Sequence, residues 1–150
     1  METFKTTTLT REELVALHQE IGYVTEQGTH PGLLTEELNE TVKYWLRRLN
    51  TFLSKEVKSL EKDRIELCEK YGTLNKETDI YDFGENKDTW QEEYNVLKSI
   101  EVPVKHTIFK FKDFNFTSKR NYATFDKIKE APEGSEEPVV TPPVKLKKTK

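Results

Sequence analysis

The side chains that most often bind metals or act as nucleophiles are few in this chain and lie far apart. The histidines are His18, His30 and His106, and Cys68 is the single cysteine. None of these spacings matches a metal-ligand pattern, and one thiol can form neither an intrachain disulfide nor a zinc-thiolate site. We interpret each histidine as a surface or capping residue and Cys68 as a small buried hydrophobe. A lone thiol also fits a reducing compartment.

Other arrangements that support catalysis are missing as well. No serine lies in a nucleophile-elbow motif, and the six glycines form no phosphate-binding loop. Acidic residues gather between Glu77 and Asp88, but this segment lacks the glycine turn and the closing glutamate of an EF-hand. We interpret it as a solvated loop. Because no nucleophile, base and orienting residue can be grouped, we predict a protein that is not an enzyme and holds no cofactor or metal.

The segment from Lys105 to Lys129 alternates cations with aromatic rings, which could stack bases along a charged groove. We favour the simpler interpretation of a half-buried strand over about 105–116, with lysines on its wet face. Phe114 and Phe116 fall on the opposite parity to Phe109 and Phe111, which indicates a bulge near Asp113 or two short strands. The phenylalanines either fill the chain's own core or contact a neighbour. They are Phe109, Phe111, Phe114 and Phe116.

The composition limits the size of the core and the classes of partner. The 150 residues allow one modest domain with extensions, and apolar and charged residues each make up 34%. Typical chains are more apolar and less charged, so we expect a thin core and stability that depends on association. The net charge of −3 is no nucleic-acid signature. We find neither a membrane-spanning run nor a signal peptide, and expect a soluble protein made in a cytoplasm.

A long amphipathic helix over about 35–71 is the strongest structural signal. Thr35 would cap its start and Gly72 would end it in a left-handed conformation. The apolar stripe steps by four and three residues and changes phase near Phe52, like a stutter. The stripe either packs on the same chain or, with Trp45, Leu46 and Leu53 beside it, meets another subunit.

Shorter elements are expected on both sides of this helix. A capping box of Thr10 and Glu13, with a staple of Leu9 and Leu14, predicts a helix over 11–21. We also predict a strand or arm at 3–8, a loop at 28–32 and a strand near 80–83. A helix over about 88–100, capped by Asp88, would fold back antiparallel on the long helix.

We therefore predict a mainly α fold with a small β element. Residues 1–130 would form a helical domain. Residues 131–150 are rich in proline and charge and would form an extended tail, because they cannot bury enough apolar surface to order themselves.

The order of these parts resembles a group of small proteins of tailed bacteriophages that are usually encoded among virion structural genes. The resemblance covers roughly 34–116. It is carried by Glu69-Lys70-Tyr71-Gly72 at the end of the long helix and by Glu101-Val102-Pro103-Val104 before a strand. It implies a minor virion component of the neck, ring or tail region, assembled in the host cytoplasm. Its partners would be other virion proteins and copies of itself.

The main alternative is a stand-alone binding module, either a regulator or inhibitor or a single-strand nucleic-acid binder that uses 105–129. We favour the assembly role over a nucleic-acid partner and expect no membrane partner. Our candidate contact residues are Trp45, Leu46, Leu53, Phe109, Phe111, Phe114, Phe116, Lys110, Lys112, Lys119 and Arg120.

Overall fold

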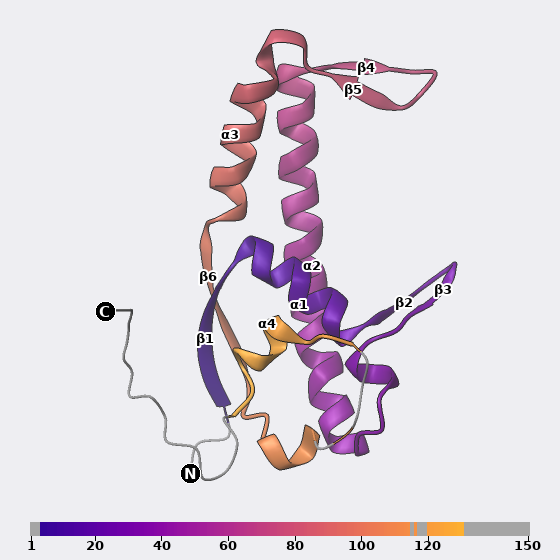
Figure 1. Ribbon diagram of the computed structural model, residues 1–150, viewed down its shortest axis with the longest axis vertical. Coiled ribbons are helices and arrows are strands. Elements are labelled where there is room, and N and C mark those ends of the chain that lie inside the picture. Colours follow the sequence, from indigo (N-terminus) through magenta and orange to yellow (C-terminus); the bar gives the residue numbers. More distant parts are fainter. Residues whose placement is uncertain (1–3, 115, 117–119, 131–150) are drawn as a thin grey trace.

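The computed structural model describes residues 4–114, 116 and 120–130; the predicted tail at 131–150 lies outside these ranges. Figure 1 shows a long helix, α2 (Glu40–Tyr71), that runs through most of the molecule's length, with the other elements placed along it. The first half of α2 lies in a packed body. The second half forms a slender arm, which we define as residues 54–100. The fold is mainly α with a small β element, as predicted; in the described residues the β part consists of three two-stranded antiparallel sheets.

The helix α2 spans 32 residues, or about 48 Å. Its cap is Asn39, whose Oδ1 accepts a 2.9 Å hydrogen bond from the Val42 amide. The predicted start at Thr35 was wrong, because the Thr35 hydroxyl bonds to Gly32 in a separate 3-10 turn, η1 (Leu33–Thr35). Gly72 does end α2, but with extended backbone rather than a left-handed conformation. A side chain there would meet the Phe83 ring at 2.9 Å.

The helix α1 (Arg11–Ile21) has the predicted bounds and cap. The Thr10 hydroxyl accepts from the Glu13 amide at 3.1 Å, and the Thr10 amide donates to the Glu13 carboxylate at 2.9 Å. Leu9 and Leu14, the predicted staple, are both buried.

The N-terminal segment is a strand, β1 (Phe4–Thr10), paired antiparallel with β6 (Glu101–Thr107). The predicted strand at 105–116 is correct only at its first residues. After Thr107 the chain leaves the sheet and forms a 3-10 turn, η3 (Phe111–Phe114). The change of parity between the phenylalanines therefore reflects this turn, not a bulge.

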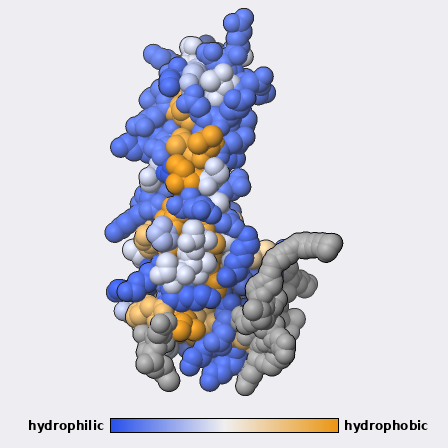
Figure 2. Space-filling model, turned by 90° about the vertical axis from the view of Figure 1, so that its left-hand side faces the viewer, coloured by the Kyte–Doolittle hydropathy of each residue, from blue (hydrophilic) through white to orange (hydrophobic). Residues whose placement is uncertain are grey.

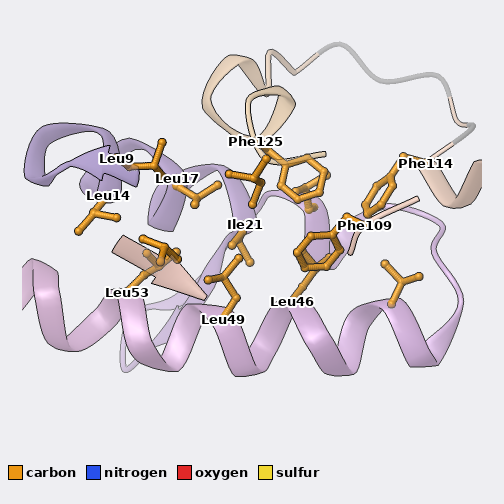
Figure 3. Close-up of a cluster of buried hydrophobic side chains, with 14 residues drawn as sticks. Leu9, Leu14, Leu17, Ile21, Leu46, Leu49, Leu53, Phe109, Phe114 and Phe125 are labelled. Atoms are coloured by element: carbon orange, nitrogen blue, oxygen red, sulfur yellow. The ribbon is translucent and has the colours of Figure 1, made fainter. Parts of the chain in front are cut away.

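One cluster of apolar side chains forms the core of the body (Figure 3). It lies between α1, the first half of α2, the β1–β6 pair and a short helix that the sequence did not predict, α4 (Ala123–Asp126). The rings of Phe109, Phe114 and Phe125 meet here with centroids 4.9 to 6.0 Å apart. Two of the four predicted phenylalanines thus fill the chain's own core.

The arm is the predicted antiparallel helix pair. The helix α3 (Lys87–Lys98) returns along the second half of α2, and a hairpin of β4 (Thr73–Asn75) and β5 (Ile80–Asp82) projects from its tip (Figure 1). Asp88 is not the cap, because a 3-10 turn, η2 (Gly84–Asn86), leads directly into α3 without a side-chain cap. The strand predicted near 80–83 is β5.

A second hairpin, β2 (Tyr23–Thr25) with β3 (Gly28–His30), projects from the body. Residues 28–30, predicted as part of a loop, are therefore a strand. The Tyr23 ring stacks between His18 at 4.5 Å and His30 at 4.8 Å, which fixes the base of this hairpin on α1.

Candidate interaction surfaces

The described residues contain no group of three His, Cys, Asp or Glu side chains that could hold a metal ion. Within the same part of the chain, no helix is both long and apolar enough to cross a membrane. Cys68 is buried, as predicted, and its sulfur lies 3.6 Å from Nη1 of Arg64. The interpretation of His106 as a surface or capping residue was wrong, because only 3% of it is exposed.

The predicted contact residues of the long helix separate into two kinds. Leu46 and Leu53 are fully buried in the body, so the hypothesis that they meet another subunit was wrong. The apolar stripe of α2 that contains them faces α1 and the β1–β6 pair instead. Trp45, one position before Leu46, is only partly buried and packs against the edge of the core.

The basic and aromatic stretch does not form a row of open rings. Phe109 and Phe114 are buried; Phe111 and Phe116 are half-buried. Nζ of Lys129 lies 5.4 Å from the centroid of Phe111, and Tyr122 meets Phe116 edge-on at 6.3 Å. The cations remain exposed at Lys110, Lys112 and Arg120, while Lys119 lies outside the described residues. A single-strand binder needs exposed rings for stacking, so the nucleic-acid interpretation loses its main support.

The first candidate surface is a groove of about 440 Å³ between β6 and α2, which we name the Trp45 groove. The pairing of β1 with β6 brings Phe4 to the side of α2, where its ring meets Trp45 edge-on at 5.4 Å. Tyr44 meets Trp45 edge-on at 5.1 Å, outside the groove lining. The groove is lined by Phe4, Trp45, Arg48, Leu49, Phe52, Pro103, Lys105, His106 and Thr107.

The Trp45 groove is positively charged. Its lining includes Arg48 and Lys105 and no carboxylate. Nζ of Lys105 lies 5.3 Å from the centroid of the Phe4 ring, so this cation borders the aromatic surface. His106 adds no charge at neutral pH, because burial lowers its pKa below the ordinary value. The groove therefore suits a ligand that carries apolar groups together with negative charge.

The second candidate surface is the arm. The helix α3 has no fully buried residue, and beyond Leu53 only Leu60 and Cys68 of α2 are buried. Figure 2, viewed from the α3 side, shows hydrophobic residues exposed along this slender part. The exposed fractions are 39% for Ile65, 38% for Leu74, 65% for Ile80, 64% for Val96 and 45% for Ile100.

Aromatic stacking holds the arm together in place of a core. The Trp90 ring lies between Phe83 at 4.6 Å and Tyr94 at 5.6 Å. The Tyr71 hydroxyl at the end of α2 donates to Glu93 of α3. The bond from Tyr71 to Glu93 joins α2 to α3, whereas Val96 and Ile100 stay exposed.

Neither surface could be identified from the sequence alone. Trp45, Arg48 and Phe52 have the spacing of one helix face, but Phe4 and Lys105 reach them only through strand pairing.

Comparisons with known proteins add no identity: no family model matches the chain, and no curated protein or solved structure matches it either.

Proposed function

We propose that the protein is a non-enzymatic structural assembly protein whose arm packs against the arm of a second copy. For the setting we propose a minor virion component in the neck, ring or tail region of a tailed phage. The exposed apolar surface of the arm is the observation that supports assembly. The resemblance of residues 34–116 to small phage proteins supports the setting.

The physical argument concerns how an antiparallel helix pair becomes stable. A helix of 12 residues such as α3 is marginal in water unless a packed face supports it. In the arm, Trp90 and Tyr94 of α3 are half-buried and their rings stack, but Val96 and Ile100 stay in solvent. Two helix hairpins commonly bury such stripes by packing together as a four-helix bundle. A second copy of the arm would provide the missing two helices.

The stand-alone binding module remains the competing function. A nucleic-acid binder would lose affinity steeply as the salt concentration rises, because its binding releases counterions. Assembly through the arm buries apolar side chains and responds to protein concentration instead. The dependence on salt concentration and on protein concentration therefore distinguishes the two functions.

The test is the mass of the full chain by light scattering over a wide range of protein concentration. The proposal expects an oligomer that forms as concentration rises and is lost in the double variant V96E/I100E. The matched control is Val24→Glu in the other hairpin, where 78% of the side chain is exposed; this variant should still assemble. A monomer at every concentration would overturn assembly between copies.

The virion setting has its own test. Mass spectrometry of purified particles from a phage that encodes the chain should detect it in a fixed ratio to other structural proteins. Its absence from particles would remove the setting and leave the result on assembly unaffected.

A further inference from the structure

We propose that the Trp45 groove binds the proline-rich, acidic segment of the same chain, residues 132–143. This inference rests on the groove and on the printed sequence, and not on the proposed function. The segment lies outside the described residues and begins two positions after Glu130, the last of them.

The apolar chemistry of the two partners matches. The segment contains Pro132, Pro138, Pro142 and Pro143. Proline-rich segments favour the polyproline II conformation and bind in grooves lined with aromatic rings, at a low entropic cost. Three aromatic rings line the Trp45 groove, those of Phe4, Trp45 and Phe52, and Pro103 completes an apolar wall.

The charges match as well. The segment carries Glu133, Glu136 and Glu137 and no cation. The groove presents Arg48 and Lys105, with no carboxylate in its lining. Opposite charges on the two partners favour this pairing and disfavour the lysine-rich last residues, 145–150, as the occupant.

The tether begins close to the groove. The Glu130 amide, at the end of the described chain, donates a 2.8 Å hydrogen bond to the carbonyl of Phe109. The Phe109 ring lies 5.8 Å from the ring of His106, which lines the groove. An extended chain advances by about 3.3–3.6 Å per residue, so the first few residues of the segment suffice to reach the groove, and the rest of the segment can lie in it. A short tether gives an effective concentration of the order of millimolar, so even a weak affinity fills the groove.

The test places a spin label in the segment of the full chain. Val139→Cys provides the labelling site, and buried Cys68 should not react, which a labelling reaction on the unmodified chain checks. In nitrogen-15 spectra the proposal expects strong broadening of the Trp45 indole N–H. The Trp90 indole, in the arm, serves as the internal reference and should stay sharp.

Charge reversal then tests the recognition chemistry. R48E/K105E should abolish the broadening of Trp45, and the matched control K58E/K62E, at exposed positions of α2, should retain it. A sample that mixes spin-labelled chain with nitrogen-15 chain lacking the label should show no broadening. Broadening in that mixture means that the segment binds another copy and overturns docking within one chain. Absence of broadening in the labelled chain, or equal broadening of both indoles, overturns occupancy of the groove.

Discussion

The imidazole of His18 in α1 donates from Nδ1 to Oδ1 of Asn50 in α2 across 2.8 Å. The direction follows from the other end of the Asn50 amide, whose Nδ2 donates to the Gly22 carbonyl at 2.6 Å. Oδ1 therefore faces the imidazole as an acceptor, and Nδ1 of His18 must carry hydrogen. One buried amide thus joins the two main helices of the body and holds the turn after α1.

Replacement of Asn50 by alanine should destabilise the body. The change leaves the Gly22 carbonyl and the His18 N–H without their partner, and a buried polar group left unpaired costs about 1–3 kcal/mol. Urea unfolding should show this loss as a lower midpoint. The control is Thr51→Ala at the next, exposed position, which should change stability by less than about 0.5 kcal/mol. Equal effects of the two variants would contradict the bridging role.

Stability should fall as the solution becomes acidic below about pH 6.5. Burial lowers the pKa of both His18 and His106 in the folded state. The unfolded chain then binds more protons between the folded and unfolded pKa values, so stability is complete above the unfolded value and is lost as pH falls through this window. Urea midpoints at pH 7.5 and 5.5 test this directly. Proton NMR should show both imidazoles titrating below 6.5, and titration at or above that value would contradict the prediction.

Removal of the Asp63 carboxylate should lower the stability of the fold more than removal of the guanidinium of its ion-pair partner, Arg11. Nη2 of Arg11 lies 2.8 Å from Oδ2 of Asp63 and 3.3 Å from the Ser59 hydroxyl, and the Arg11 side chain is only 9% exposed. Asp63→Ala leaves this guanidinium buried and unpaired, at a cost of about 1–3 kcal/mol because Asp63 is itself partly exposed. Arg11→Met removes the buried charge, so it should be milder. Thermal unfolding of the two single variants and of the double variant measures the order of their stabilities.

Gly32 should not tolerate a side chain. A methyl group there would lie 2.7 Å from the carbonyl carbon of Ile21 and 2.8 Å from the Gly22 amide nitrogen, both backbone atoms that cannot move aside. We expect Gly32→Ala to cost about 1–3 kcal/mol in urea unfolding. The control is Gly84→Asn. The φ of Gly84 is +51°, which asparagine tolerates, and no atom lies within 4 Å of the place that a Cβ would take. This substitution should therefore lower the free energy of unfolding by only a few tenths of a kcal/mol. A harmless Gly32→Ala would show that the turn can open.

The features predicted correctly are those determined by neighbours in the sequence. The Thr10–Glu13 box, the helix at 11–21 and the antiparallel helix pair each depend on short-range patterns. The start of α2 was misplaced because Thr35 and Asn39 are both good caps, and only the contact of Thr35 with Gly32 decides between them. Both contacts are local, but the pattern of a helix cap does not show that Thr35 belongs to a separate 3-10 turn.

The candidate surfaces were harder to predict because they combine distant segments. Phe109 and Phe114 were predicted in a half-buried strand region with a change of parity between them, yet both rings pack on Phe125, more than ten residues further on. Trp45 was named as a contact candidate and does line the groove, but the residues beside it, Phe4 and Lys105, lie 41 and 60 positions away in the sequence. Leu46 and Leu53 were misassigned because their burial depends on α1 and the β1–β6 pair.

The pairing of β1 with β6 has a consequence for how the chain folds during synthesis. Thr7 and His106, which bond across this sheet at 2.8 Å, are 99 positions apart. A ribosome adds about 5–20 residues per second, so β1 waits roughly 5–20 s for its partner. Contacts between such distant residues also slow the search for the native state. Until β6 has been synthesised, the backbone groups of β1 that face it have no strand partner, so this sheet closes late in folding.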